Sequence, residues 1–326
     1  IRSAAARCLL LGAAAIWGLA LAAIQFLPTQ ELSRLAQRSA DQSWESYALQ
    51  YSMWPWRLVT LFMPDLFGNP ARGTYWGYAT YWEDAGYIGV LPFALAALAL
   101  LAWVRGRWKR APRESTAPET IPFFSLLALF SLLMALGQNT PFYLFFYRNV
   151  PGFGQFQAPA RWLCIYTGAM AVLAARGLDA LRPSRALVFV GRLSLVAAVQ
   201  AALLAWLATT GPVRDAFAGA GLPNLEPTIT RALLRFSLLA AATLLLLLWQ
   251  QRRFKRANEG APGRRGQLQK QVWPAAVLLL VAADLIQAGY GLNPAVDAAL
   301  YAHSTETGTA IAADGPRGRL YYSAEN

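Results

Sequence analysis

Residues 237–256 read SLLAAATLLLLLWQQRRFKR, and this stretch decides the fold class. A long apolar run without a charged side chain ends in four basic residues within the five positions 252–256. About 20 mostly apolar residues in a helix cross the roughly 30 Å hydrocarbon core of a bilayer, and basic residues collect at the cytoplasmic end of such a span. The stretch therefore predicts a membrane-spanning helix at 231–249 and its cytoplasmic end.

The composition of the whole chain is that of a membrane protein. Of its 326 residues 56% are hydrophobic and 14% are charged, whereas soluble domains carry about 25% charged residues. The net charge of +12 does not indicate nucleic-acid binding, because the basic residues form short clusters between apolar runs and not one stripe with contact aromatics. We expect these clusters to lie beside the headgroups of membrane lipids.

Similar apolar runs predict an all-α, polytopic transmembrane helical bundle of about seven spans. The spans are expected near 8–27, 86–104, 121–137, 161–181, 187–209, 231–249 and 273–291. Prolines stand at the expected ends of spans, where they cost a helix least, at Pro28, Pro122, Pro183, Pro212 and Pro274. Residues 1–292 form the expected transmembrane domain, and 293–326 the truncated start of an extracytoplasmic domain. Because the chain opens with Ile1 and stops directly after a strand-like segment, we expect an internal fragment of a longer protein.

The positions of Lys and Arg predict the orientation. Basic clusters follow the second, fourth and sixth spans, at 105–113, 182–192 and 252–270. Since basic loops stay in the cytoplasm, the amino-terminal end should be inside and the carboxy-terminal end outside. A signal peptide is the alternative interpretation of the first span, but its apolar run is long and lacks a small-x-small cleavage site.

Two loops on the expected outer side carry most of the polar and aromatic residues. The loop at 28–85 is rich in Trp and Tyr, which settle at membrane–water interfaces. Within it, residues 53–67 place apolar side chains at helical spacing, which predicts a short interfacial helix. The second loop, at 138–160, carries turn signals around Asn139 and Gly152.

Charged residues inside spans are candidate functional residues, because burying a charge in hydrocarbon is costly. Asp284 lies well inside the seventh span, with Gln287 nearly one turn later on the same side. It is either a functional residue or a structural partner of a neighbouring helix, and in both cases it should face other helices and not lipid. Asp179 lies beside Arg176, and a local ion pair explains it.

Five further charged residues lie at the expected outer boundary and should converge on one outward-facing cavity: Glu31, Arg34, Glu83, Asp84 and Arg161. Adjacent carboxylates suit a general base or a divalent-metal site, and the alternative is a solvated helix boundary. Arg148 and Arg161 suit phosphate binding because the guanidinium fork matches phosphate oxygens. Their alternative is an anchor to lipid headgroups.

Other kinds of site find little support. Cys8 and Cys164 fall inside apolar stretches, so a disulfide is not expected. His303 is the only histidine, which excludes zinc-ligand spacing and nearly excludes a Ser-His-Asp triad. No P-loop or dinucleotide fingerprint is present.

Several segments together resemble the bacterial YfhO family of polytopic membrane proteins, which is related to the GT-C glycosyltransferases. The similar segments are QFLP (25–28), LFMPDLFG (61–68), YWG (75–77), YIGVLP (87–92), VPGF (150–153), APARW (158–162), ADL (283–285) and GYGLNP (289–294). Their order and spacing carry the resemblance, which covers most of the chain. Gln157 departs from the family, where this position is often basic, and weakens a phosphate role for that loop.

The resemblance implies sugar transfer from a polyprenyl-phosphate donor to a cell-envelope acceptor at the outer face of the bacterial cytoplasmic membrane. In such enzymes a carboxylate of the first external loop takes the acceptor's proton, and cations or a metal ion steady the leaving phosphate. That loop would lie upstream of Ile1, so the catalytic base is expected outside this chain. The competing interpretations are a transporter or lipid flippase, whose substrate site lies near the midplane of the bilayer, and a non-catalytic assembly factor.

Overall fold

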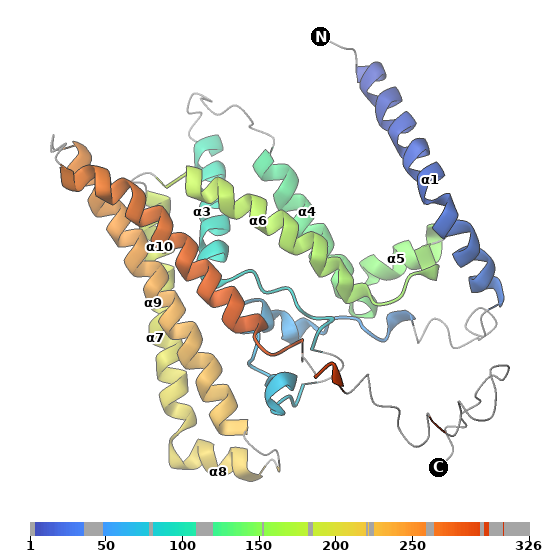
Figure 1. Cartoon of the computed structure of the whole chain (residues 1–326). Coiled ribbons are helices and arrows are strands. Elements are labelled where there is room, and N and C mark those ends of the chain that lie inside the picture. The colour runs from blue at the N-terminus through green and yellow to red at the C-terminus, as the bar shows by residue number, and fades with distance from the viewer. Residues whose placement is uncertain are drawn as a thin grey trace.

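Long helices make up most of the chain in the computed structural model (Figure 1). The structure describes residues 4–35, 48–77, 81–108, 120–151, 153–181, 185–219, 221, 225–258, 264–293, 297–299 and 309, and no strand occurs among them. The α-helices are α1 (Ala4–Leu35), α3 (Val90–Trp108), α4 (Thr120–Ala135), α5 (Pro141–Asn149), α6 (Leu163–Asp179), α7 (Arg185–Ala208), α8 (Gly211–Gly219), α9 (Leu225–Asn258) and α10 (Arg264–Gly289). The all-helical fold class is therefore confirmed, and an α-helix overlaps each of the seven expected spans, although not every one of these helices is long enough to be a candidate span.

Within the described part of the chain, four helices are long and apolar enough to cross a membrane. Their candidate spans are Cys8–Leu32, Arg185–Ala208, Leu225–Arg253 and Val272–Gly289, while Val90–Gly106 and Thr120–Ala135 are shorter apolar helices. Large apolar side chains such as Leu203 and Trp206 of α7 are exposed on the bundle surface, where hydrocarbon would cover them. These features support the membrane assignment.

Small side chains allow close helix pairing. Antiparallel α7 and α9 pack through buried Ala198, Ala201 and Ala205 of α7, and Ser237 Oγ donates to the Ala198 carbonyl at 2.8 Å. Gly177 of α6 lies against the backbone of α3, and a Cβ there would be 1.9 Å from the Leu95 carbonyl oxygen. Small residues at these contacts are typical of membrane helices, where van der Waals packing drives association.

Two prolines depart from their expected positions. Pro28 and Pro274 lie inside α1 and α10, and not at the ends of these helices. A proline inside a helix removes one backbone hydrogen bond, and near Pro28 the Thr29 hydroxyl donates to the Gln25 carbonyl at 2.7 Å. The side-chain bond adds a local contact in the turn where a main-chain bond is missing.

The first external loop differs in form from the expected interfacial helix. A 3₁₀-helix, η2, covers only Pro55–Leu61, and turns follow up to Phe67. Pro64 lies where an α-helix would continue, and its ring would clash with the carbonyl four residues earlier. Leu61 is buried in the main core, where Leu58 also packs. The segment is therefore part of the protein core at this end of the bundle.

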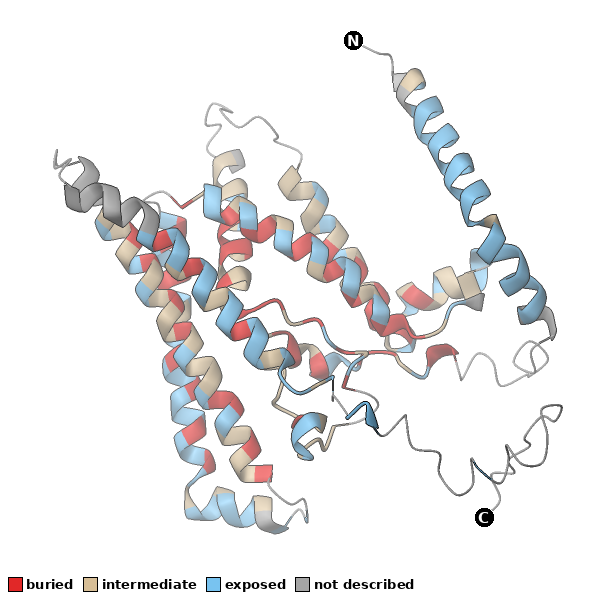
Figure 2. Cartoon of the chain, in the orientation of Figure 1, coloured by how far each residue is buried: buried red, intermediate tan, exposed pale blue. Residues whose placement is uncertain are grey.

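We use the name loop end for the end of the bundle at which η2 (Pro55–Leu61) and the segment 81–89 before α3 lie. Figure 1 shows α3 and α6 beginning there and α4 and α10 finishing there, while α7, α8 and α9 extend farther. Figure 2 shows buried residues along the chain between η2 and α3. By contrast α1 stands to one side in this view, and none of Cys8–Leu32 is buried. The expected extracytoplasmic domain at 293–326 lies almost wholly outside the described residues.

Candidate functional site

A buried ion pair joins η2 to the segment before α3. The Arg57 Nε lies 2.7 Å from Asp84 Oδ2, and the two side chains are 2% and 7% exposed. Arg57 is placed here because η2 turns it inward on the same face as buried Thr60, which follows three residues later, one turn of a 3₁₀-helix. Buried charges need such a partner, since an isolated one is strongly disfavoured.

Aromatic rings surround the Arg57 guanidinium. Its central carbon lies 5.7 Å from the centroid of Phe67, 5.9 Å from that of Tyr75 and 6.0 Å from that of Trp56. Rings at this distance attract a cation through their negative faces. The aromatic residues of the loop thus form the wall around a buried charge, in addition to any interfacial role.

Burial perturbs the protonation of Asp84. The pKa of this carboxyl is raised from 3.8 to about 6 in total. Loss of solvent is the largest cause, Arg57 lowers the pKa and neighbouring Glu83 raises it. At neutral pH Asp84 is still mostly ionised. A carboxylate with a pKa near the working pH is suited to proton transfer.

Glu83 binds the arginine at the start of the fourth expected span. Arg161 Nε donates to Glu83 Oε2 at 3.1 Å and Nη2 donates to Oε1 at 3.0 Å. The 3₁₀-helix η6 (Pro159–Trp162) presents Arg161 toward Glu83. The Arg161 side chain is 66% exposed, so the pair lies at the protein surface. Two of the guanidinium donors of Arg161 already bind the Glu83 carboxylate.

A second charged cluster centres on Arg235 of α9. Arg235 Nη2 donates to Asp284 Oδ1 at 2.9 Å, and Nη1 lies 3.5 Å from Asp65 Oδ2. Asp284 also accepts from the Tyr87 hydroxyl at 2.7 and 2.8 Å and from the Val90 amide at 3.2 Å. As expected, Asp284 is buried, at 3% exposure. Arg235 therefore joins α9 to α10 and to the first loop, and Asp284 joins α10 to the start of α3.

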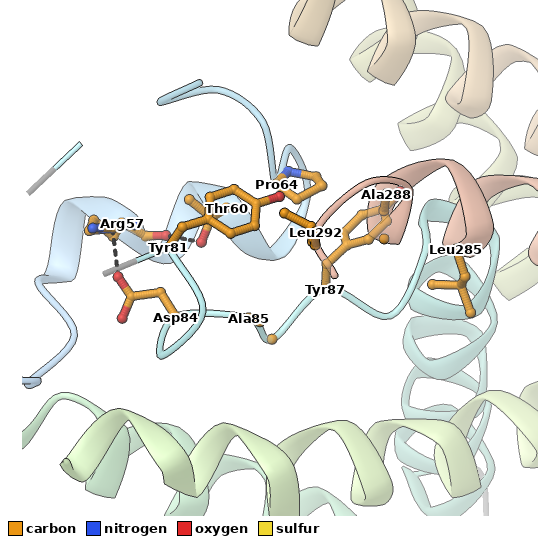
Figure 3. Close-up of a pocket in the computed structure, with 12 residues that line it drawn as sticks. Arg57, Thr60, Pro64, Tyr81, Asp84, Ala85, Tyr87, Leu285, Ala288 and Leu292 are labelled. Atoms are coloured by element: carbon orange, nitrogen blue, oxygen red, sulfur yellow. Dashed lines mark hydrogen bonds and ion pairs between the residues drawn. The ribbon is translucent and has the colours of Figure 1, made fainter. Parts of the chain in front are cut away.

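The two larger pockets beside these clusters have different linings. The first has a volume of about 220 Å³ and is lined by Arg57, Thr60, Pro64, Tyr81, Asp84, Ala85, Gly86, Tyr87, Leu285, Ala288, Gly289 and Leu292. Figure 3 shows the Arg57–Asp84 pair at one end of this pocket and Leu285 of α10 at the other. The second pocket, of about 380 Å³, lies between the loop and α9.

The expected site residues are only partly brought together. Glu83, Asp84 and Arg161 meet at the loop end, but Glu31 is exposed on α1 and the side chain of Arg34 lies outside the described residues. Arg148 is exposed in the last turn of α5. The Asp179–Arg176 pair is present at 3.6 Å.

Sequence reasoning missed Arg57, Asp65 and Arg235. Arg235 lies inside the expected span at 231–249, so the cost of an intramembrane charge was a usable signal. Nothing in the sequence marked Arg57 and Asp65 as buried site residues, because a charged residue in a long loop is ordinarily solvated. Among the described residues no group of three or more His, Cys, Asp or Glu side chains is placed to hold a metal ion.

Comparison with protein families, with curated proteins and with solved structures finds no match to this chain.

Proposed function

We propose that the chain is part of a membrane glycosyltransferase that moves a sugar from a polyprenyl-phosphate donor to a cell-envelope acceptor. In this proposal the seven helices α1, α3, α4, α6, α7, α9 and α10 cross the bacterial cytoplasmic membrane. The loop end faces outward, because the basic clusters lie in the opposite loops. The resemblance to the YfhO family motivates the reaction type.

The observation that carries the proposal is the pocket bordered by Arg57 and Asp84. Transfer requires a carboxylate that takes the proton of the acceptor hydroxyl. The family resemblance alone puts this base upstream of Ile1, and we propose Asp84 in its place because Asp84 borders a pocket of this chain. Its pKa of about 6 keeps it ionised yet basic, and Arg57 holds its orientation. The acceptor oxygen then bonds to the anomeric carbon, and the bond from that carbon to the phosphate oxygen breaks. The phosphate leaves with the electron pair.

Sugar transfer in liposomes tests this role. Purified protein is supplied with a radiolabelled polyprenyl-phosphate sugar and an envelope extract as acceptor. Asp84→Asn should lower the rate by roughly 10²–10⁴, the usual contribution of a general base, whereas Arg214→Gln, an exposed change on α8, should leave it unaltered. Arg161→Ala should abolish transfer if this arginine contacts the donor, and retained transfer would reduce it to a headgroup anchor.

The outcome that rejects the proposed base is normal transfer by Asp84→Asn. Because Asp84→Asn leaves the buried Arg57 without its carboxylate partner, some loss of stability is expected. Its elution on gel filtration must therefore match that of the unmodified protein, and both rates are measured well below the melting temperature of the variant. No transfer by the unmodified protein with any envelope extract would reject the glycosyltransferase proposal itself.

One observation favours transport as a second candidate. Arg235 and Asp284 form a buried ion pair on α9 and α10, two of the candidate spans, and intramembrane charges are typical of transport pathways. A flippase would move a labelled lipid phosphate between leaflets without chemical change. Translocation in sealed liposomes that lack an acceptor distinguishes it from a transferase.

A further inference from the structure

The pocket between the first loop and α9 combines cationic and apolar walls. It is about 380 Å³ in volume, and its lining includes Arg72 from the loop, Arg231 and Arg235 from α9 and Gln287 from α10. Leu234 and Leu238 of α9 line the same pocket. A site of this composition fits a ligand with an anionic head and a hydrocarbon chain.

The pocket carries an excess of positive charge. Asp65 is the acidic residue of its lining, and this carboxylate lies 3.5 Å from Arg235 and 4.0 Å from Arg72. Arg231 is exposed and forms no ion pair with any of the acidic side chains that the structure describes. Guanidinium groups bind phosphate through parallel N–H donors, and Arg231 has its donors available.

An apolar track leads from the pocket along α9. Leu234, Leu238 and Leu245 are 46%, 71% and 66% exposed. They follow Arg231 at intervals of three, four and seven residues, so all four side chains lie on one helical face. A hydrocarbon chain lying on this face would cover leucines that are otherwise open to the surroundings.

In the proposed membrane placement, Arg231 lies at the depth of lipid headgroups. The candidate span of α9, Leu225–Arg253, has 29 residues, about 43 Å at 1.5 Å per residue, which is longer than the roughly 30 Å hydrocarbon core. With the basic end of the helix at one boundary, the opposite boundary falls near Arg231. From there, the positions of the track leucines follow α9 toward the middle of the bilayer.

We propose that this pocket binds the phosphate group of a membrane lipid, with Arg231 and Arg72 contacting the phosphate and the lipid chain lying on Leu234 and Leu238. The ligand is either a polyprenyl phosphate or an anionic phospholipid, which share this chemistry. Arg235, held between two carboxylates, positions the wall of the pocket. The inference goes beyond the proposed sugar transfer, since lipid binding is measured without an acceptor and stands or falls separately.

Lipid binding to the purified full chain in detergent tests the site by native mass spectrometry. The probes are a polyprenyl monophosphate, phosphatidylglycerol and a polyprenol without phosphate, with inorganic phosphate as a competitor. The variants are Arg231→Gln and Arg72→Gln, and the matched control is Arg214→Gln, an exposed arginine on α8. Arg231 has no acidic partner among the described residues, so its replacement should not disturb folding, and the melting temperature verifies this.

Loss of one charge-assisted contact should weaken binding about tenfold or more in Arg231→Gln, with Arg214→Gln unchanged and the polyprenol bound only weakly. Preference for polyprenyl monophosphate over phosphatidylglycerol identifies a substrate site, and equal binding identifies a general site for anionic lipids. Equal lipid binding by the unmodified protein, Arg231→Gln and Arg72→Gln would overturn the inference, as would displacement of the lipid by millimolar inorganic phosphate alone. Sugar transfer that persists without such binding would overturn this site and leave the transferase proposal in place.

Discussion

Arg235 holds two carboxylates that are far apart in the sequence, Asp65 in the loop and Asp284 in α10. Each of the three side chains is at most 14% exposed, so water contributes little to their solvation. Such a cluster is stable only when complete, because removing one member leaves an uncompensated buried charge.

Removing the shared cation should therefore be costly. Arg235→Gln is expected to lower the free energy of unfolding by about 3–5 kcal/mol, the usual effect of breaking a buried pair. Arg231→Gln, on the same helix one turn earlier, should change it little because Arg231 is exposed. Melting temperatures in detergent compare the two.

A double-mutant cycle separates charge from packing in the same cluster. If unpaired charge causes the loss, adding Asp284→Asn to Arg235→Gln should recover part of it, since a neutral amide needs no cation. Additive losses in the double variant would contradict this explanation.

The raised pKa of Asp84 gives folding a pH dependence. The folded chain binds a proton on Asp84 more tightly than the unfolded chain, so the contribution to stability is greatest below about pH 4 and is lost as the pH rises through about 6. The loss amounts to about 3 kcal/mol. Melting temperatures should therefore fall between pH 4 and pH 7 by more in the unmodified protein than in Asp84→Asn. Parallel pH curves for the two proteins would refute a buried, titrating Asp84.

At the scale of elements, glycine decides how closely α3 and α6 approach. The backbone of α3 occupies the place where a side chain at position 177 would project. Close packing of this kind tolerates little added volume. On the same helix Gly168 is exposed, and no atom lies within 4 Å of a Cβ built there.

Alanine at these two glycines should have opposite effects. Gly177→Ala is expected to destabilise the protein by about 1–3 kcal/mol through overpacking. Gly168→Ala should be neutral or stabilising by up to about 1 kcal/mol, because alanine favours a helix. Thermal unfolding of both variants is the measurement, and equal melting temperatures would argue against the close contact of α3 and α6.

At the scale of the whole molecule, successive long helices run in alternate directions, so the carboxy-terminal ends of α3 and α9, which carry described basic residues, lie at the end of the bundle opposite the loop end (Figure 1). In a membrane, the basic helix ends would lie on one side of the bilayer and the pockets of the loop end on the other. We expect the loop end to face outward.

Cysteine labelling in intact cells checks the proposed orientation. With Cys8 and Cys164 replaced, Ala71→Cys in the exposed part of the first loop should react with a membrane-impermeant maleimide. Arg252→Cys, near the basic end of α9, should react only after the cells are opened. The reverse pattern would invert the scheme.

The sequence alone determined the helical class, the approximate helix positions and the burial of Asp284. These follow from local properties, since apolar run length and isolated charges are legible along the chain. Helix ends were less accurate: α9 begins six residues before the expected 231 and continues nine beyond 249, because polar residues at span ends extend a helix beyond the hydrocarbon.

Only the tertiary structure decided which charges meet. Arg57 pairs with Asp84 and Arg161 with Glu83 because η2 and η6 pack at the same end of the bundle, whereas Glu31 lies on a helix that stands apart. Arg235 finds Asp65 and Asp284 across 170 and 49 residues of sequence. Contacts over such separations depend on how the helices pack, and apolar patterns along the chain specify which segments are helical but not which faces of different helices come together.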